Sequence, residues 1–132
     1  MNNTTDIFDK AKIEIQKLWA DHKELSNFVN FPKNLVLKSL KSQKTSVTDK
    51  LFNWNKNLNT KLLELHKAIS DLSPYVNWEQ GYKEKEVGKD FLNKYGFFEL
   101  IGPSGHFKTS EMALYVNYLC ENAYYPWHNH DA

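Results

Sequence analysis

The stretch Tyr95-Gly-Phe-Phe-Glu-Leu-Ile-Gly-Pro-Ser-Gly105 marks the change from helical to extended patterning in this chain of 132 residues. Phe97 to Ile101 is a short apolar run, which is typical of a buried strand. Gly102-Pro-Ser-Gly105 is a turn sequence, because Pro fixes φ and Gly can adopt positive φ. The pattern predicts a strand, a tight turn and a return of the chain near His106-Phe107.

A second strand is predicted downstream, where apolar and polar residues alternate between Met112 and Cys120. Glu121 to Pro126 interrupts that strand, and Trp127 to Ala132 resumes an extended path. One face of the predicted strand is formed by Met112, Leu114, Val116, Tyr118 and Cys120.

Upstream of these strands the apolar residues recur at helical spacing. Thr4 or Thr5 can cap a first helix, which we expect from about Asp6 to Val29 and to end before Pro32. Its apolar residues follow steps of three and four, which indicates one buried stripe. The stripe consists of Ile7, Phe8, Ala11, Ile15, Leu18, Trp19, His22, Leu25 and Val29.

Two further helices are predicted before Pro74. Leu35 to Leu40 suggests a short second helix, and Lys41 to Ser46 reads as a connecting loop. A third helix is expected to begin near Thr48 and to end at Ser73-Pro74. We therefore predict a helical region over residues 1–74 and a β-rich region over 75–132, packed as one domain.

The composition fits a folded intracellular protein. The hydrophobic fraction of 41% in 132 residues is sufficient for one core. Cys120 is the single cysteine and cannot form an internal disulfide, and Met1 to Asp6 lacks the pattern of a signal peptide. No apolar run approaches the roughly 20 residues that span a bilayer. We expect a cytoplasmic protein with no membrane association.

The charge pattern argues against a nucleic-acid-binding surface. All 17 basic residues are lysines, so the guanidinium groups that usually read bases and phosphates are absent. Residues 33–67 hold eight Lys against two acids, and residues 68–132 hold five Lys against nine acids. Because no aromatic and Arg interleaving accompanies the lysines, a solvated helix face explains the basic segment better than an acidic partner does.

The residues that point to chemistry are His128 and His130. Residues two apart on a strand share a face, so both imidazoles can bind one metal ion. Imidazole binds zinc, iron, nickel and copper, but three or four protein ligands are usual. On spacing alone, two exposed histidines without a metal explain the pair equally well.

The surrounding sequence favours metal binding by His128 and His130 over two exposed histidines without a metal. Tyr95 to Gly105, followed by a strand and by Tyr125-Pro-Trp-His-Asn-His130, resembles the cupin-type dimethylsulfoniopropionate lyases. The resemblance implies an α+β fold, in which an N-terminal helical region precedes the opening strands of an incomplete cupin β-barrel. Asn122 stands where the cupin pattern has Gly, and Asn also adopts the left-handed region. Because further ligands of the family would follow Ala132, we expect this chain to be an N-terminal fragment.

The resemblance also implies roles for single residues. His128 and His130 become ligands of a divalent transition metal, either Fe, Zn, Mn or Ni, and Tyr125 becomes a catalytic phenol. The implied reaction is a β-elimination that cleaves dimethylsulfoniopropionate, a small-molecule substrate, to dimethyl sulfide and acrylate. A nearby cation lowers the pKa of a phenol, so a tyrosinate can serve as the base. A homodimer is the remaining expectation about partners.

Alternatives remain for these residues. Another cupin activity, such as a dioxygenase or an isomerase, has the same ligand spacing, and a non-catalytic helical module would use the Lys-rich face instead. Tyr125 can also simply pack the mouth of a barrel. Among the other candidates, His22 and His66 are predicted to pack or to mark helix boundaries, His106 has no visible partner in the sequence, and Cys120 is predicted to be a buried small hydrophobe.

Overall fold

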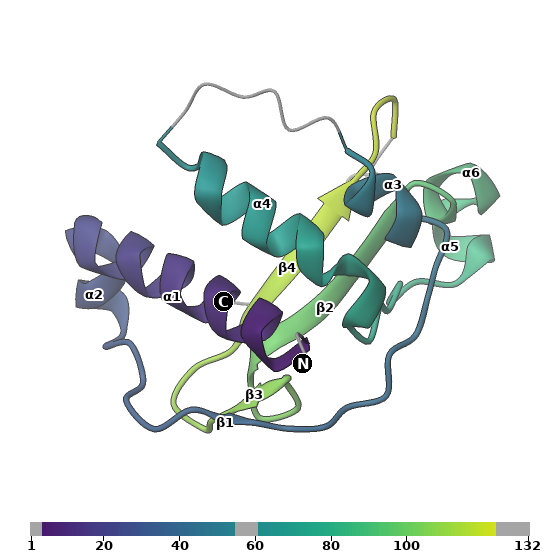
Figure 1. Ribbon diagram of the computed structural model, residues 1–132. Coiled ribbons are helices and arrows are strands. Elements are labelled where there is room, and N and C mark those ends of the chain that lie inside the picture. The colour runs from purple at the N-terminus through teal and green to yellow at the C-terminus, as the bar shows by residue number, and fades with distance from the viewer. Residues whose placement is uncertain (1–3, 55–60, 124–132) are drawn as a thin grey trace.

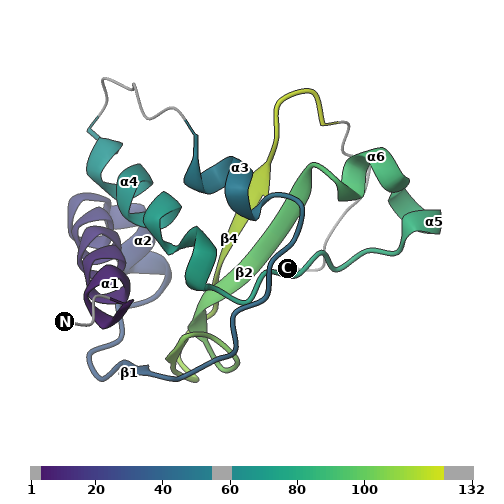
Figure 2. The same ribbon diagram turned by 45° about the vertical axis from the view of Figure 1, so that its right-hand side comes forward.

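A layer of helices covers one face of a mixed β-sheet in the computed structural model, which describes residues 4–54 and 61–123 (Figure 1). The two longest helices, α1 (Thr4–Asp21) and α4 (Leu63–Leu72), lie side by side over the sheet. Turning the molecule shows the two layers edge-on, with α1 and α4 on one side of the sheet and the short helices α5 and α6 on the other (Figure 2). The predicted α+β class is confirmed.

The core forms between these layers. Helix α1 presents Phe8, Ala11, Ile15 and Trp19, which recur every three or four residues and are at most 9% exposed. The sheet contributes residues such as Phe98 from its central strand, which is 0% exposed. Burial of apolar surface by both layers therefore holds the helical part against the β-rich part. The boundary at residue 74 and the single-domain organisation stay predictions.

The expected first helix is in fact two helices. Helix α1 ends at Asp21, and α2 (Lys23–Phe28) begins after His22, whose backbone is extended with φ −129° and ψ 105°. The His22 imidazole Nδ1 lies 3.0 Å from the Leu18 carbonyl oxygen, which is the acceptor that the next helical N–H would have used. The single helix predicted over 6–29 was therefore wrong at His22.

Two other helix predictions were wrong in the same region. Residues 35–40 contain no helix, because Val36–Leu37 forms strand β1, which pairs antiparallel with Phe107 and Lys108. The third predicted helix is interrupted as well. Helix α3 covers Thr48–Phe52 and ends at Asn53, a residue type of low helix propensity, before α4 begins.

Short helical elements also occur where the sequence indicated none. A 3₁₀ turn, η1 (Ser73–Tyr75), follows α4, and two one-turn helices, α5 (Glu84–Val87) and α6 (Lys89–Leu92), precede the sheet. Helix α5 begins where the Glu86 carboxylate accepts the backbone N–H of Lys83 at 2.7 Å. Gly88, with φ +87°, separates α5 from α6.

The sheet has the strand order β1-β3-β2-β4, with β2 (Tyr95–Gly102) at its centre. The strand that the period-two pattern predicted is β4 (Leu114–Leu119). It pairs antiparallel with β2, from Tyr95 opposite Leu119 to Glu99 opposite Tyr115. Strand β3 (Phe107–Lys108) pairs parallel with the end of β2. The chain therefore does not return along β2 as expected, since the loop of residues 103–106 carries it over to the β1 side.

Within residues 4–54 and 61–123, no helix combines the length and apolar character that crossing a bilayer requires.

Candidate functional site

The predicted metal and catalytic residues, Tyr125, His128 and His130, lie outside the described residues, so their roles stay predictions. The structure describes the chain up to Ala123, which precedes this segment in the sequence. At the end of β4, the Cys120 N–H donates to the Lys94 carbonyl at 2.8 Å. The described chain therefore ends beside the N-terminal end of β2.

A tight turn follows β4, and Asn122 occupies its critical position. Its φ is +65°, in the left-handed region that Gly and Asn adopt most readily. Its carbonyl oxygen accepts a hydrogen bond from the Lys94 ammonium, with an N···O distance of 3.3 Å. The expectation that Asn can stand where the cupin pattern has Gly is confirmed by this backbone conformation.

The face of the sheet opposite to α1 and α4 carries polar and aromatic side chains from β2 and β4, and Phe91 of α6 stacks on its Tyr95 end, with ring centroids 4.9 Å apart. Strand alternation places Phe97 and Glu99 on this face, opposite to the buried Phe98. Each faces a β4 residue directly, since Phe97 is opposite Asn117 and Glu99 is opposite Tyr115. We call this the open face of the sheet and define it by Glu79, Tyr95, Phe97, Glu99, Tyr115 and Asn117.

Glu79 joins the open face through an isolated antiparallel bridge to Phe97. The two residues exchange backbone hydrogen bonds, with N···O distances of 2.7 Å and 2.8 Å. Directly opposed residues in an antiparallel pair have their side chains on the same face. Glu79, Phe97 and Asn117 therefore form one row across the open face, and Glu99 with Tyr115 forms the next.

The open face is electrostatically negative. The charge of the Glu99 carboxylate raises the pKa of the Tyr115 phenol, and burial, a hydrogen bond to Glu99 and the charge of Glu79 raise it further. The Glu99 carboxylate also accepts the backbone N–H of Ser104 at 2.9 Å. No lysine of the described part of the chain forms an ion pair with Glu79 or Glu99.

Aromatic rings accompany these charges. The Phe97 and Tyr115 rings meet edge to face, with their centroids 5.9 Å apart. The Tyr95 hydroxyl donates to the Asn117 side-chain oxygen at 3.1 Å, which ties β2 to β4 across the face. Sequence reasoning missed this arrangement, although the alternation that predicted β4 also placed Tyr115 and Asn117 on a common side.

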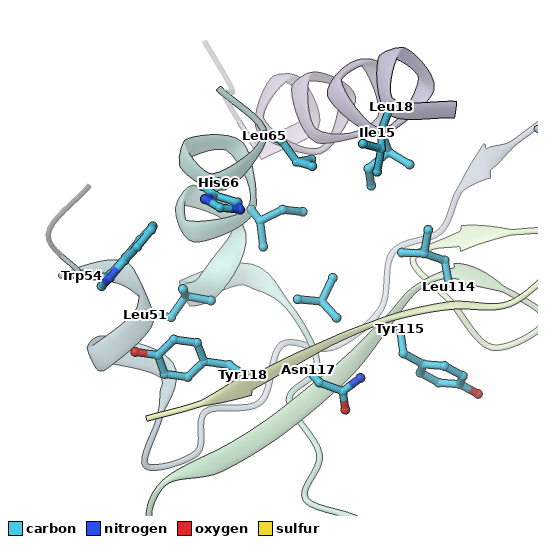
Figure 3. A pocket seen from close by; sticks show the side chains of 12 residues that line it. Ile15, Leu18, Leu51, Trp54, Leu65, His66, Leu114, Tyr115, Asn117 and Tyr118 are labelled. Carbon is cyan, nitrogen blue, oxygen red and sulfur yellow. The ribbon is translucent and has the colours of Figure 1, made fainter. Parts of the chain in front are cut away.

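A cavity of about 420 Å³ lies on the other side of β4, between that strand and the helices. Figure 3 shows Leu114 and Tyr118 on the helix side of β4, while Tyr115 and Asn117 point away from the helices. The cavity is largely apolar. Its one buried polar atom without a hydrogen-bond partner among the described residues is His66 Nδ1.

The structure also places the remaining candidate residues. His106 is 2% exposed, and its Nε2 accepts the Asn77 N–H at 3.1 Å, so the expectation of no partner was wrong. Burial lowers the pKa of His106 to about 4. Cys120 is half-buried against the core rather than fully buried. Among the residues that the structure describes, no group of three or more His, Cys, Asp or Glu side chains gathers at metal-binding distances.

Helices α1 and α4 packed on one face of a mixed sheet, and a His-x-His segment that follows β4 in the sequence, are features of an α+β protein of the cupin type. The chain belongs to the dimethylsulfoniopropionate lyase family, whose profile matches residues 34–132.

Similarity to individual proteins supports this assignment. The dimethylsulfoniopropionate lyase DddQ of Ruegeria pomeroyi is 26% identical over 132 residues, a match that covers 100% of this chain and 66% of DddQ. Crystal structures of the lyases RdDddP and RnDddQII include a chain that superposes with a TM-score of 0.82 at 29% identity, covering 88% of this chain and 60% of the other. The chain thus spans about two thirds of the length of these relatives or less.

The crystal structure of DddQ from Ruegeria pomeroyi superposes with a TM-score of 0.83 over 92% of this chain and 61% of the DddQ chain. At 24% identity this superposition shows a shared fold. The opening strands of the sheet and the helices that cover them are therefore the arrangement found in solved dimethylsulfoniopropionate lyases.

Proposed function

We propose that this chain carries the helical region and the metal-binding segment of a lyase that cleaves dimethylsulfoniopropionate to dimethyl sulfide and acrylate. The observation that carries the proposal is the family match over residues 34–132, because it includes the segment from Tyr125 to His130. The geometry of the described residues supports it, since β4 and the Asn122 turn lead the chain into that segment.

His128 and His130 are the proposed metal ligands. Two imidazoles at positions i and i+2 of an extended segment suit a divalent transition metal, and Fe, Zn, Mn and Ni all accept such donors. A divalent ion bound there would supply positive charge that stabilises the negative charge developing on the substrate carboxylate during elimination. His128 and His130 would hold that charge in a fixed place.

Tyr125 is the proposed base. The phenolate oxygen takes the proton from the carbon next to the substrate carboxylate. The electrons of that C–H bond form the new carbon–carbon double bond, and the carbon–sulfur bond breaks with its electron pair leaving on sulfur. The products are acrylate, neutral dimethyl sulfide and a protonated Tyr125, so atoms and charges balance.

Two histidines are fewer ligands than a catalytic metal usually has. We therefore propose that the active lyase takes at least one further donor from protein outside these 132 residues, and that residues 1–132 are a fragment with negligible lyase activity.

The proposed partner is a small-molecule substrate, and the proposed assembly is a homodimer. We also propose that the protein works in the cytoplasm, as the single cysteine indicates. It binds neither nucleic acid nor a membrane in this proposal.

The test compares residues 1–132 with a chimera in which the part of DddQ not matched by this chain completes the fold. Both proteins are incubated with dimethylsulfoniopropionate and each candidate metal, and dimethyl sulfide and acrylate are measured together. We expect equal amounts of the two products from the chimera and none above background from residues 1–132. A folded, metal-loaded chimera that releases neither product would contradict the proposal and favour another cupin activity or a non-catalytic module.

A further inference from the structure

The open face carries carboxylate and aromatic side chains that the proposed elimination does not use. Glu79 and Glu99 lie in adjacent rows beside the rings of Phe97 and Tyr115. The two carboxylates both act on Tyr115, so the negative potential extends across these rows. In a chain of formal net charge +1, this face is a local concentration of negative and aromatic character.

The proposed substrate has two charged ends of different chemistry. Its carboxylate suits a metal ion, whereas its sulfonium is a cation whose charge is surrounded by carbon atoms and carries no N–H or O–H donor. Such a cation is recognised by the negative faces of aromatic rings and by nearby carboxylate charge, rather than by hydrogen bonds. The open face combines these two elements.

Glu99 is suited to such a role because its carboxylate already accepts hydrogen bonds from neighbouring groups. One carboxylate oxygen accepts the Ser104 N–H, and the carboxylate also interacts with the Tyr115 hydroxyl. These contacts fix the side chain on the open face while its charge remains. A fixed charge that has already lost part of its solvation attracts a weakly hydrated cation better than it attracts a strongly hydrated ammonium.

We propose that the open face of the sheet, through Glu79, Phe97, Glu99 and Tyr115, is a subsite for the sulfonium cation of the substrate. This inference rests on the proposed function for the identity of the cation. The subsite would orient the substrate by holding its sulfonium end against β2 and β4. These four residues are positioning residues and take no part in proton transfer.

The test uses trimethylsulfonium, which has the cation of the substrate but no carboxylate, so that no metal is needed for binding. Isotope-labelled residues 1–132 are titrated with trimethylsulfonium and, separately, with neutral tert-butyl alcohol of similar size. We expect amide shifts at Phe97, Glu99, Tyr115 and Asn117 with trimethylsulfonium alone. Binding should weaken as salt is added, because these carboxylates are partly exposed to solvent.

Charge-neutral variants test the residues. Glu79→Gln and Glu99→Gln should each weaken trimethylsulfonium binding by about threefold to tenfold. Gln at position 99 keeps an oxygen that can accept the Ser104 N–H, so the turn is retained. If Glu99→Gln nevertheless does not fold, the more exposed Glu79→Gln decides the test. Glu111→Gln, which removes an exposed carboxylate outside the open face, is the matched control and should bind as the wild type does.

Equal affinity of the wild type and both face variants, or shifts that cluster elsewhere, would overturn the subsite. The lyase assay on the chimera separates this failure from failure of the proposed function. A chimera that releases dimethyl sulfide with an unchanged KM in Glu79→Gln and Glu99→Gln refutes the subsite and leaves the function standing. Trimethylsulfonium binding on the open face without any lyase activity of the chimera supports a sulfonium-binding face and refutes the lyase function, and with it the identity of the cation as that of dimethylsulfoniopropionate.

Discussion

His106 Nε2 accepts the backbone N–H of Asn77 at 3.1 Å, which joins the loop before β3 to the segment that precedes α5. The imidazole also packs against Phe8 of α1, with ring centroids 4.9 Å apart. Because Nε2 is the acceptor, the neutral ring carries its proton on Nδ1, and a proton on Nε2 would break the hydrogen bond. A single buried side chain thus connects the helical layer, the sheet and the connecting segment.

This contact predicts that the protein loses stability in mild acid. Burial lowers the pKa of His106 from 6.5 to about 4 in the folded protein, so the unfolded chain binds the proton more readily. The stabilisation is complete above pH 6.5 and is lost as the pH falls toward 4, by up to about 3 kcal/mol. Urea unfolding at several pH values between 7 and 4.5 measures this loss.

His106→Gln provides the control for that measurement. Glutamine keeps an acceptor for the Asn77 N–H but does not titrate in this range. We expect a flatter dependence of unfolding free energy on pH in His106→Gln, whereas His22→Gln should behave as the wild type does. The same acid sensitivity in His106→Gln and in the wild type would assign the effect to other groups.

Gly102 is predicted to tolerate no side chain. Its φ is +155°, and a Cβ there would meet the Glu99 carboxylate and lie 3.3 Å from the Ala113 Cα. Gly102→Ala should lower the unfolding free energy by about 1–3 kcal/mol, as expected for a strained backbone. Gly88→Ala is the informative comparison, because its φ is also positive at +87° but nothing lies within 4 Å of the added atom. Equal destabilisation by both changes would show that backbone strain alone, without the clash at Glu99, accounts for the loss.

His66 is predicted to be a site where an apolar ring stabilises the fold. Its Nδ1 is buried without a partner in the described structure, and its ring meets Trp54 edge to face at 5.8 Å. His66→Phe keeps a planar ring beside Trp54 and removes the unsatisfied nitrogen, which should raise the unfolding free energy by about 1 kcal/mol. Thermal unfolding of His66→Phe and of His22→Phe measures the difference, since the His22 ring nitrogen already has the Leu18 carbonyl nearby. A destabilised His66→Phe would mean that this nitrogen has a partner outside the described residues.

Tyr125→Phe is predicted to separate proton transfer from metal binding in the chimera with the remaining part of DddQ. The change keeps the ring and removes the oxygen, so turnover should fall by roughly 10²–10⁴-fold while the metal content stays the same. Product release and metal analysis on one preparation measure both quantities. Loss of metal in Tyr125→Phe would instead make the phenol oxygen a metal ligand.

The sequence predicted those elements whose pattern is local. Alternation between Met112 and Cys120 predicted β4, and the apolar stripe of Phe8, Ala11, Ile15 and Trp19 predicted the buried side of α1. The turn at Asn122 followed from the backbone freedom of that residue type. Each of these predictions depended on residues within a few positions of one another.

The features that were missed depend on contacts between distant segments. Strand β1 exists because Val36 and Leu37 find partners about 70 residues further along, at Lys108 and Phe107, and no local signal outweighed the helical spacing of Leu35, Val36 and Leu40. The partner of His106 is 29 residues away in sequence. Which residues share the open face depends on the register between β2 and β4, and the sequence of either strand alone does not define that register.

The most direct test of the account is metal content and dimethyl sulfide release of the chimera with His130→Ala. An imidazole in the first coordination shell cannot be lost without opening a position that water fills poorly. We predict that His130→Ala loses most of the bound metal and all detectable product, while His22→Ala, a change in an exposed histidine at a helix boundary, retains both. A His130→Ala protein with full metal content and normal dimethyl sulfide release would contradict the assignment of the site.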